Sequence, residues 1–232
     1  MKYRSLVALL VVAWLTPTLA SAYLISYSGS LSSLSGGLQG TGFWPDDGPR
    51  GGTTISWVVS QNDDGSWHYV YNLTVPRADV SHFILETSED FTSADIINPT
   101  GPYASYSIGW NTGFPGVNTQ PNPYMPDDEY GIKFDSTYGT TLVFTFDSPR
   151  MPVWADFYAK CGAVGGTQNT IWNTGFSTSE ENDPTAPIGN GSIAYHILAP
   201  DTQTGPVPEP GTVCLVGLGL AGLKFIRRRK AS

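Results

Sequence analysis

Carboxylates that could hold a cation follow one another in short runs of this chain of 232 residues. The clearest runs are Asp63-Asp64 and Asp127-Asp128-Glu129. Calcium takes several hard oxygen ligands from loops of this kind, so these two runs predict calcium as the one candidate cofactor. Neither run has the spacing of an EF-hand, and Asp-rich segments also serve simply as turns. Two further runs share this character: Asp46-Asp47, and Glu180-Glu181 with Asp183.

Motifs for catalysis are absent from the sequence. It has no G-x-S-x-G, H-E-x-x-H or P-loop pattern, and its histidines, His68, His82 and His196, fall on three separate strand candidates. We interpret His82 and His196 as sheet residues with local hydrogen bonds. A glycosidase needs only two suitably spaced carboxylates, and the sequence does not single out a pair. The chain is therefore predicted not to be an enzyme, and a secreted glycan-active enzyme is the weakest of three alternatives.

Aromatic side chains offer a different chemistry, stacking on sugar rings. Phe43 and Trp44 lie in a loop rich in glycine, residues 36–52, where Trp44 is predicted to be exposed and to form a ligand-binding surface with Phe43. The alternative is an aromatic plug that closes one end of the fold. Trp57, Trp67 and Trp154 follow strand alternation and are predicted to lie in the core.

The elements that carry these residues are predicted to be strands. Apolar residues at 55, 57 and 59 and at 67, 69, 71, 73 and 75 alternate with polar ones around an Asn-Asp-Asp-Gly turn, which indicates a β-hairpin. Residues 87–97 are the one helix candidate. The fold class is all-β, a single antiparallel β-sandwich, jelly-roll-like. Further strand candidates are residues 23–27, 80–86, 103–110, 131–134, 141–146, 153–159, 170–176 and 192–198.

One five-residue sequence, Trp-Asn-Thr-Gly-Phe, occurs twice, at 110–114 and 172–176. The flanking residues differ, so a duplicated domain is not indicated. Each copy is predicted to be a strand end whose Trp packs inward before a turn, and the alternative is that both copies form one binding surface. Cys161 is the one cysteine of the central region and is predicted to be a buried free thiol.

The N-terminus has the pattern of a secretory signal peptide. Basic residues precede an apolar stretch at 6–15, and Ala20 and Ala22 form an A-x-A cleavage site. The predicted signal peptide is residues 1–22, which makes signal peptidase a partner. An uncleaved anchor helix is the alternative.

The C-terminus combines three features within 26 residues. Pro208-Glu209-Pro210 precedes a short apolar run at 213–226, and Arg227, Arg228 and Arg229 follow it directly. A helix of 14 residues rises about 21 Å, against a hydrocarbon core of about 30 Å. The basic end predicts a cytoplasmic C-terminus and an exported domain.

This combination resembles the PEP-CTERM sorting signal. The resemblance implies recognition by an exosortase, a membrane-embedded cysteine protease, and sorting to the surface of Gram-negative bacteria that make exopolysaccharide. It also implies that Pro208, Glu209 and Pro210 are the processing site. A C-terminal anchor that is never cut is the alternative.

Three segments are therefore expected: a signal peptide at 1–22, a β-sandwich domain at 23–205 and a sorting signal at 206–232. Residues 23–207 hold five basic and nineteen acidic side chains, a net charge of −14, which disfavours nucleic acid. We predict an inner-membrane anchor that is transient, followed by the cell surface or extracellular matrix. There the protein would have a structural or binding role in an exopolysaccharide-rich layer such as a biofilm, with a carbohydrate-binding module as the alternative.

Overall fold

The computed structural model describes residues 25–116, 121–162, 166–176 and 183–200. Within these residues the chain forms two antiparallel sheets and a small two-stranded sheet. The first sheet has the strand order β1-β3-β4-β9-β6 and the second the order β2-β12-β11-β5-β8-β7. The strands are β1 (Ser26–Ser32), β2 (Leu38–Thr41), β3 (Thr54–Gln61), β4 (Trp67–Thr74), β5 (His82–Glu86), β6 (Ile97–Thr100), β7 (Ser105–Asn111), β8 (Glu129–Asp135), β9 (Thr141–Ser148), β10 (Pro152–Ala155), β11 (Phe157–Lys160), β12 (Thr170–Asn173) and β13 (Ile197–Pro200).

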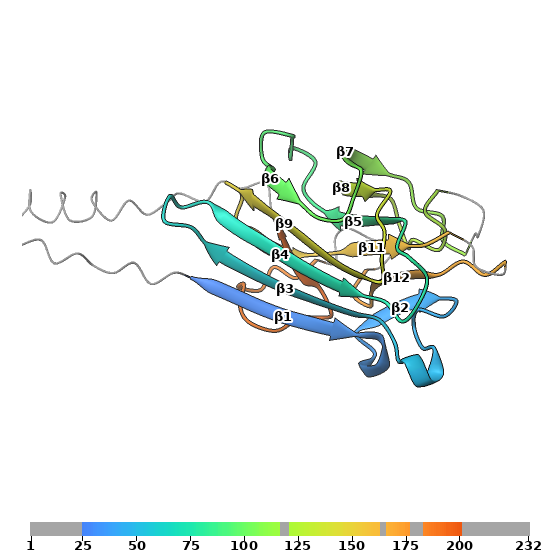
Figure 1. Ribbon diagram of the computed structural model, residues 1–232. Helices are drawn as coiled ribbons and strands as arrows, with labels where there is room; N and C mark the ends of the chain where they lie inside the picture. The colour runs from blue at the N-terminus through green and yellow to red at the C-terminus, as the bar shows by residue number, and fades with distance from the viewer. Residues whose placement is uncertain (1–24, 117–120, 163–165, 177–182, 201–232) are drawn as a thin grey trace, which may run out of the picture.

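The two large sheets form the layers of a β-sandwich, with β1, β3, β4 and β9 in one layer and β7, β8, β5, β11 and β12 in the other (Figure 1). β10 and β13 pair with each other, and β13 lies against both β3 and β5. The all-β antiparallel fold is thus the one predicted. Only three pairs of consecutive strands are hydrogen-bonded neighbours within these sheets, namely β3-β4, β7-β8 and β11-β12, so most connections pass between sheets.

Alternation of apolar and polar residues builds the core. The predicted hairpin is β3 and β4, which pair from Thr54↔Thr74 to Gln61↔Trp67. Gly65 adopts a φ of 88° in the turn, a conformation that favours glycine. Aromatic rings from both layers stack in the interior, with centroids 4.9 Å apart for Phe83 and Phe144. Burying each such side chain contributes roughly 1.5–3 kcal/mol.

Three predictions about secondary structure are wrong. Residues 87–97 are not a helix, because tight turns close from Phe91 N to Ser88 O and from Asp95 N to Thr92 O. The predicted strand at 153–159 is divided at Asp156 into β10 and β11, which pair in different sheets. Strand β2 lies in a segment that was predicted to be a loop.

Tryptophan positions correct the aromatic predictions. Trp57, Trp67 and Trp154 are buried as predicted, but Trp44 is also fully buried, with an exposed fraction of 0%. Its indole Nε1 donates a 2.7 Å hydrogen bond to Arg77 O, so the indole closes the sandwich and offers no face to a ligand. Trp110 was predicted to pack inward and is 53% exposed instead, because β7 is the edge strand of its sheet.

Candidate functional site

A row of polar side chains crosses the second sheet at one end of its strands. Antiparallel pairing brings the end of one strand beside the start of its neighbour. The same end of the sheet therefore carries Asn111, Glu129, Glu86, Asp156 and Asn173. Glu86 lies directly across from Asp156, whose backbone carbonyl accepts from Glu86 N and whose N–H donates to the Glu86 carboxylate. The row therefore concentrates carboxylates on neighbouring strands.

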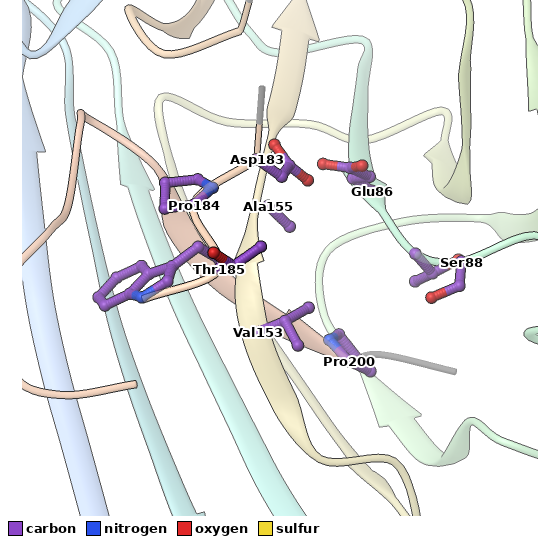
Figure 2. Close-up of a pocket in the computed structure, with 10 residues that line it drawn as sticks. Glu86, Ser88, Val153, Ala155, Asp183, Pro184, Thr185 and Pro200 are labelled. Atoms are coloured by element: carbon purple, nitrogen blue, oxygen red, sulfur yellow. The ribbon is translucent and has the colours of Figure 1, made fainter. Parts of the chain in front are cut away.

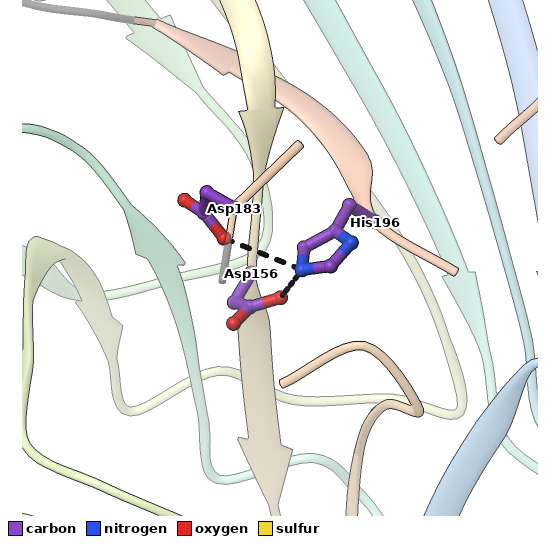
Figure 3. A group of neighbouring side chains, drawn as sticks. All are labelled: Asp156, Asp183 and His196. Atoms are coloured by element: carbon purple, nitrogen blue, oxygen red, sulfur yellow. Dashed lines mark ion pairs between the residues drawn. The ribbon is translucent and has the colours of Figure 1, made fainter. Parts of the chain in front are cut away.

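Segments outside the sheet complete the site. Nε2 of His196 lies 3.4 Å from Asp156 Oδ1 and 3.3 Å from Asp183 Oδ1 (Figure 3). The His196 and Asp156 side chains are buried and that of Asp183 is half-buried. Asp156, Asp183 and His196 form one group that could hold a metal ion, and Glu86, Glu129 and Asp156 form a second. Asp156 belongs to both groups and is the centre of the site.

Burial dominates the electrostatics of this site. It raises the pKa of Asp156 to about 7, although the charge of His196 and a hydrogen bond from Asn173 act against the rise. Burial, reinforced by the Asp183 and Asp156 charges, raises the pKa of Glu86 well above its usual range. Burial opposes a charge on His196, but Asp183 and Asp156 outweigh it and raise the pKa of the imidazole. The cluster consequently retains protons near neutral pH, since burial penalises several negative charges at once.

A cavity of about 270 Å³ opens beside the cluster. Glu86 and Asp183 reach it from one side, and their carboxylates lie close together (Figure 2). Val153 and Pro200 from the β10-β13 pair line it further along. Two carboxylates beside a cavity can bind a cation, accept hydrogen bonds from hydroxyl groups, or exchange a proton.

The two copies of the Trp-Asn-Thr-Gly-Phe sequence lie at opposite ends of this polar row. Asn173 of the second copy donates from Nδ2 to Asp156 Oδ1, and Asn111 of the first copy donates to Glu129 O. Gly175 lies under His196, because a Cβ at Gly175 would be only 2.5 Å from the imidazole Cε1. The copies thus support the site from its two ends.

The acidic runs named from the sequence mostly form hydrogen bonds within turns and loops. Asp64 accepts from the backbone and side chain of Ser66, and these hydrogen bonds lower its pKa. Asp127 accepts from the N–H of Asp128, which in turn accepts from Gly113 N. Two acids from these runs do approach the cluster, namely the buried Glu129 and Asp183.

The remaining acidic pair and the histidines are placed as follows. Asp47 forms ion pairs with Arg50 and Arg77, and these interactions lower the pKa of Asp47. His68 pairs with Asp147 on the exposed side of the first sheet. His82 is buried on the second sheet, whereas His196 precedes β13 in a turn and is not in a strand.

Sequence reasoning missed Glu86 and Asp156 as site residues and did not place His196 with them. No close spacing marks these residues, which are far apart in the chain and meet only through sheet pairing. The available signal was the repeated sequence, whose Asn173 and Gly175 contact the cluster.

A second feature of this sheet is the exposed aromatic edge, defined as Tyr106 and Trp110 on β7 together with the adjacent Tyr138. Tyr106 and Trp110 lie on the same side of the strand, and Trp110 packs edge-to-face on Tyr130. Tyr138 is 65% exposed, and its N–H donates to Pro102 O next to β7.

The predicted processing residues lie outside the described part of the chain: Ala20, Ala22, Pro208, Glu209, Pro210, Arg227, Arg228 and Arg229. Among the described residues, the structure has no helix of the length and apolar character needed to cross a membrane. No curated protein and no solved structure matches the chain. The PEP-CTERM protein-sorting motif matches residues 206–230. This match confirms the resemblance predicted from the sequence: the chain carries a PEP-CTERM sorting signal and is an exported protein that an exosortase sorts toward the cell surface.

Proposed function

We propose that this protein is a non-enzymatic component of an exopolysaccharide-rich layer, such as a biofilm matrix, and binds neutral polysaccharide through the exposed aromatic edge. Signal peptidase and exosortase would process its two ends, and the sandwich would act outside the cell. The observation that carries the binding role is the exposure of Trp110, 53%, on a strand that also presents Tyr106.

The geometry of β7 suits a chain-like ligand. Tyr106 and Trp110 are four residues apart on one side of the strand, roughly 13 Å at 3.3 Å per residue. Aromatic planes at this spacing can stack on non-adjacent sugar rings of one chain while hydroxyl groups remain in water. The acidic charge of the central region favours a neutral glycan over an anionic one, because like charges repel.

Replacing Trp110 with Ala tests this proposal. Exopolysaccharide from the native host is immobilised, and retention of the full-length protein is compared for wild type, Trp110→Ala and Val143→Ala. Val143 is the control because it is exposed, apolar and in the other large sheet. An aromatic contact worth about 1.4 kcal/mol predicts roughly tenfold weaker retention of Trp110→Ala alone. Equal retention of all three proteins would reject the aromatic edge as the binding surface.

A second candidate function is glycan hydrolysis. It is favoured by Glu86 and Asp183, which share a cavity, and by the raised pKa of Glu86, which suits a general acid. The cavity volume of about 270 Å³ is below the roughly 300–1,000 Å³ of most ligand pockets. A cavity of this size is small for a polysaccharide substrate, which favours glycan binding at the aromatic edge over hydrolysis in the cavity. Release of reducing ends from the same polysaccharide by wild type, and its loss in Glu86→Gln, would establish hydrolysis in place of binding alone.

A further inference from the structure

Three side chains from separate parts of the chain converge at spacings that suit a shared metal ion. Zinc holds nitrogen and carboxylate oxygen at about 2.0–2.1 Å, so two ligands of a regular tetrahedron lie about 3.4 Å apart. His196 Nε2 is 3.4 Å from Asp156 Oδ1 and 3.3 Å from Asp183 Oδ1. These distances match two edges of the tetrahedron.

The imidazole of His196 is oriented to bind a metal through Nε2. Nδ1 lies 3.2 Å from Ile193 O, which can only accept, so Nδ1 carries the proton and donates. Nε2 is then the atom that can release a proton and bind a metal, and it faces the two carboxylates. A histidine that binds a metal almost always donates its other N–H to a carbonyl or carboxylate in this way.

This Nε2 atom is buried and has no hydrogen bond within the described structure. The exposed fraction of His196 is 2%, and Figure 3 shows Nε2 directed at Asp156 and Asp183. Nε2 lies 3.4 and 3.3 Å from the two carboxylates, and such a buried arrangement is costly unless a proton or a metal cation lies between them.

Lysine and arginine side chains of the described residues do not compensate these acids. Among the described residues, no Lys or Arg forms an ion pair with Glu86, Asp156 or Asp183. Buried carboxylates are normally paired with a cationic group or coordinate a metal. Glu86 lies next to Asp183 and adds further negative charge.

The residues around the group hold it in place. Asn173 donates to Asp156 Oδ1, and the lack of a side chain at Gly175 allows the His196 ring to approach. The turn before His196 contains Ala194 and Tyr195 at φ values of 49° and 66°, a conformation that few residues other than glycine adopt. Such supporting contacts orient ligands at metal sites.

We propose that Asp156, Asp183 and His196 bind one divalent transition-metal ion of the zinc class. Imidazole favours zinc and its neighbours over calcium and magnesium, which prefer oxygen alone. Glu86, which lies next to Asp183, or a water from the adjoining cavity would complete the coordination. The ion ties the segment that carries Asp183 and His196 to the start of β11, independently of any glycan bound at the aromatic edge.

Metal content and affinity test this site directly. The full-length protein in detergent is stripped with EDTA, dialysed and titrated with ZnCl2 by calorimetry, followed by elemental analysis. The variants are His196→Gln and Asp156→Asn, and the matched control is His68→Gln, which removes a partly exposed histidine from a different carboxylate pair. Circular dichroism checks that each variant folds.

The expected result is one tightly bound zinc ion in wild type and His68→Gln. Affinity in the two cluster variants should fall by more than about 100-fold, since changes to supporting residues alone cost 10–100-fold. Titration of wild type with CoCl2 keeps the proposal testable if those variants do not fold, because tetrahedral cobalt with nitrogen and oxygen ligands absorbs strongly in the visible range. Wild type that binds neither ion, or His196→Gln that binds zinc as wild type does, would overturn the site.

Discussion

Protonation of His82 predicts a defined loss of stability in acid. His82 lies on β5 and is only 5% exposed, with the ring of Tyr158 at 6.0 Å. Burial, together with the charges of Lys133 and Lys160, lowers the pKa of His82 to about 3, whereas Asn122 has a smaller opposite effect. The folded protein therefore keeps this side chain neutral.

The sign and size of the effect follow from proton linkage. In the unfolded chain His82 takes up a proton near pH 6.5, but in the folded chain it does so only near pH 3. The unfolded state thus binds more protons between these values, and stability is lost as the pH falls from about 6.5 toward 3. At about pH 4.5 the loss attributable to His82 is roughly 2.7 kcal/mol, and at about pH 7.5 it is close to zero.

Urea unfolding at about pH 7.5 and pH 4.5 measures this loss. Other groups also titrate in this range, so the informative quantity is the difference between wild type and His82→Gln in the stability lost. Wild type is expected to lose roughly 2.7 kcal/mol more than His82→Gln. Equal losses in wild type and His82→Gln would refute the reasoning.

Two further substitutions test the packing described above. Gly175→Ala places a Cβ 2.5 Å from His196 Cε1, so it should destabilise the fold by about 1–3 kcal/mol and weaken zinc binding. Gly189→Ala has open space around the new Cβ, so it should change the stability by no more than about 0.5 kcal/mol. Thermal unfolding compares the two variants, and equal melting temperatures would contradict the close packing at Gly175. Trp44→Phe removes the donor to Arg77 O and should cost about 1–3 kcal/mol in urea unfolding, so an unchanged stability would contradict the role of Trp44 in closing the sandwich.

Period-two alternation was sufficient to predict the fold. Apolar residues recur at every second position at 55–59 and 67–75, on either side of a turn, and the structure pairs these two segments as β3 and β4. Division of the strand at Asp156 was not predictable, because the surrounding residues are apolar throughout and the change of sheet depends on long-range pairing. The turns at 88–95 contain residues that also suit a helix start, so local propensity alone misassigned them.

Exposure was harder to predict than secondary structure. Trp44 lies among glycines, yet its ring is covered because residues distant in sequence, such as Arg77, close over it. Trp110 alternates like a core residue, but its strand is at the sheet edge and leaves it half-exposed. Both outcomes depend on which strands become neighbours.

The candidate site illustrates the same limit. Asp183 belonged to one of the acidic runs named from the sequence, whereas Glu86 and Asp156 belonged to strand candidates without a chemical signal. Sheet register places Glu86 beside Asp156, and the turn before β13 brings in His196. The repeated Trp-Asn-Thr-Gly-Phe sequence and two of the acidic runs were the local signals that pointed to this region.

Intact mass spectrometry of the protein recovered separately from the membranes, cell surface and medium of its native host tests the central claim most directly. The sorting signal predicts a species outside the inner membrane that begins near Tyr23 and ends near Pro208 to Pro210. A mass that extends to Ser232, found only in membranes, would contradict exosortase-dependent sorting and the proposed role in the extracellular layer.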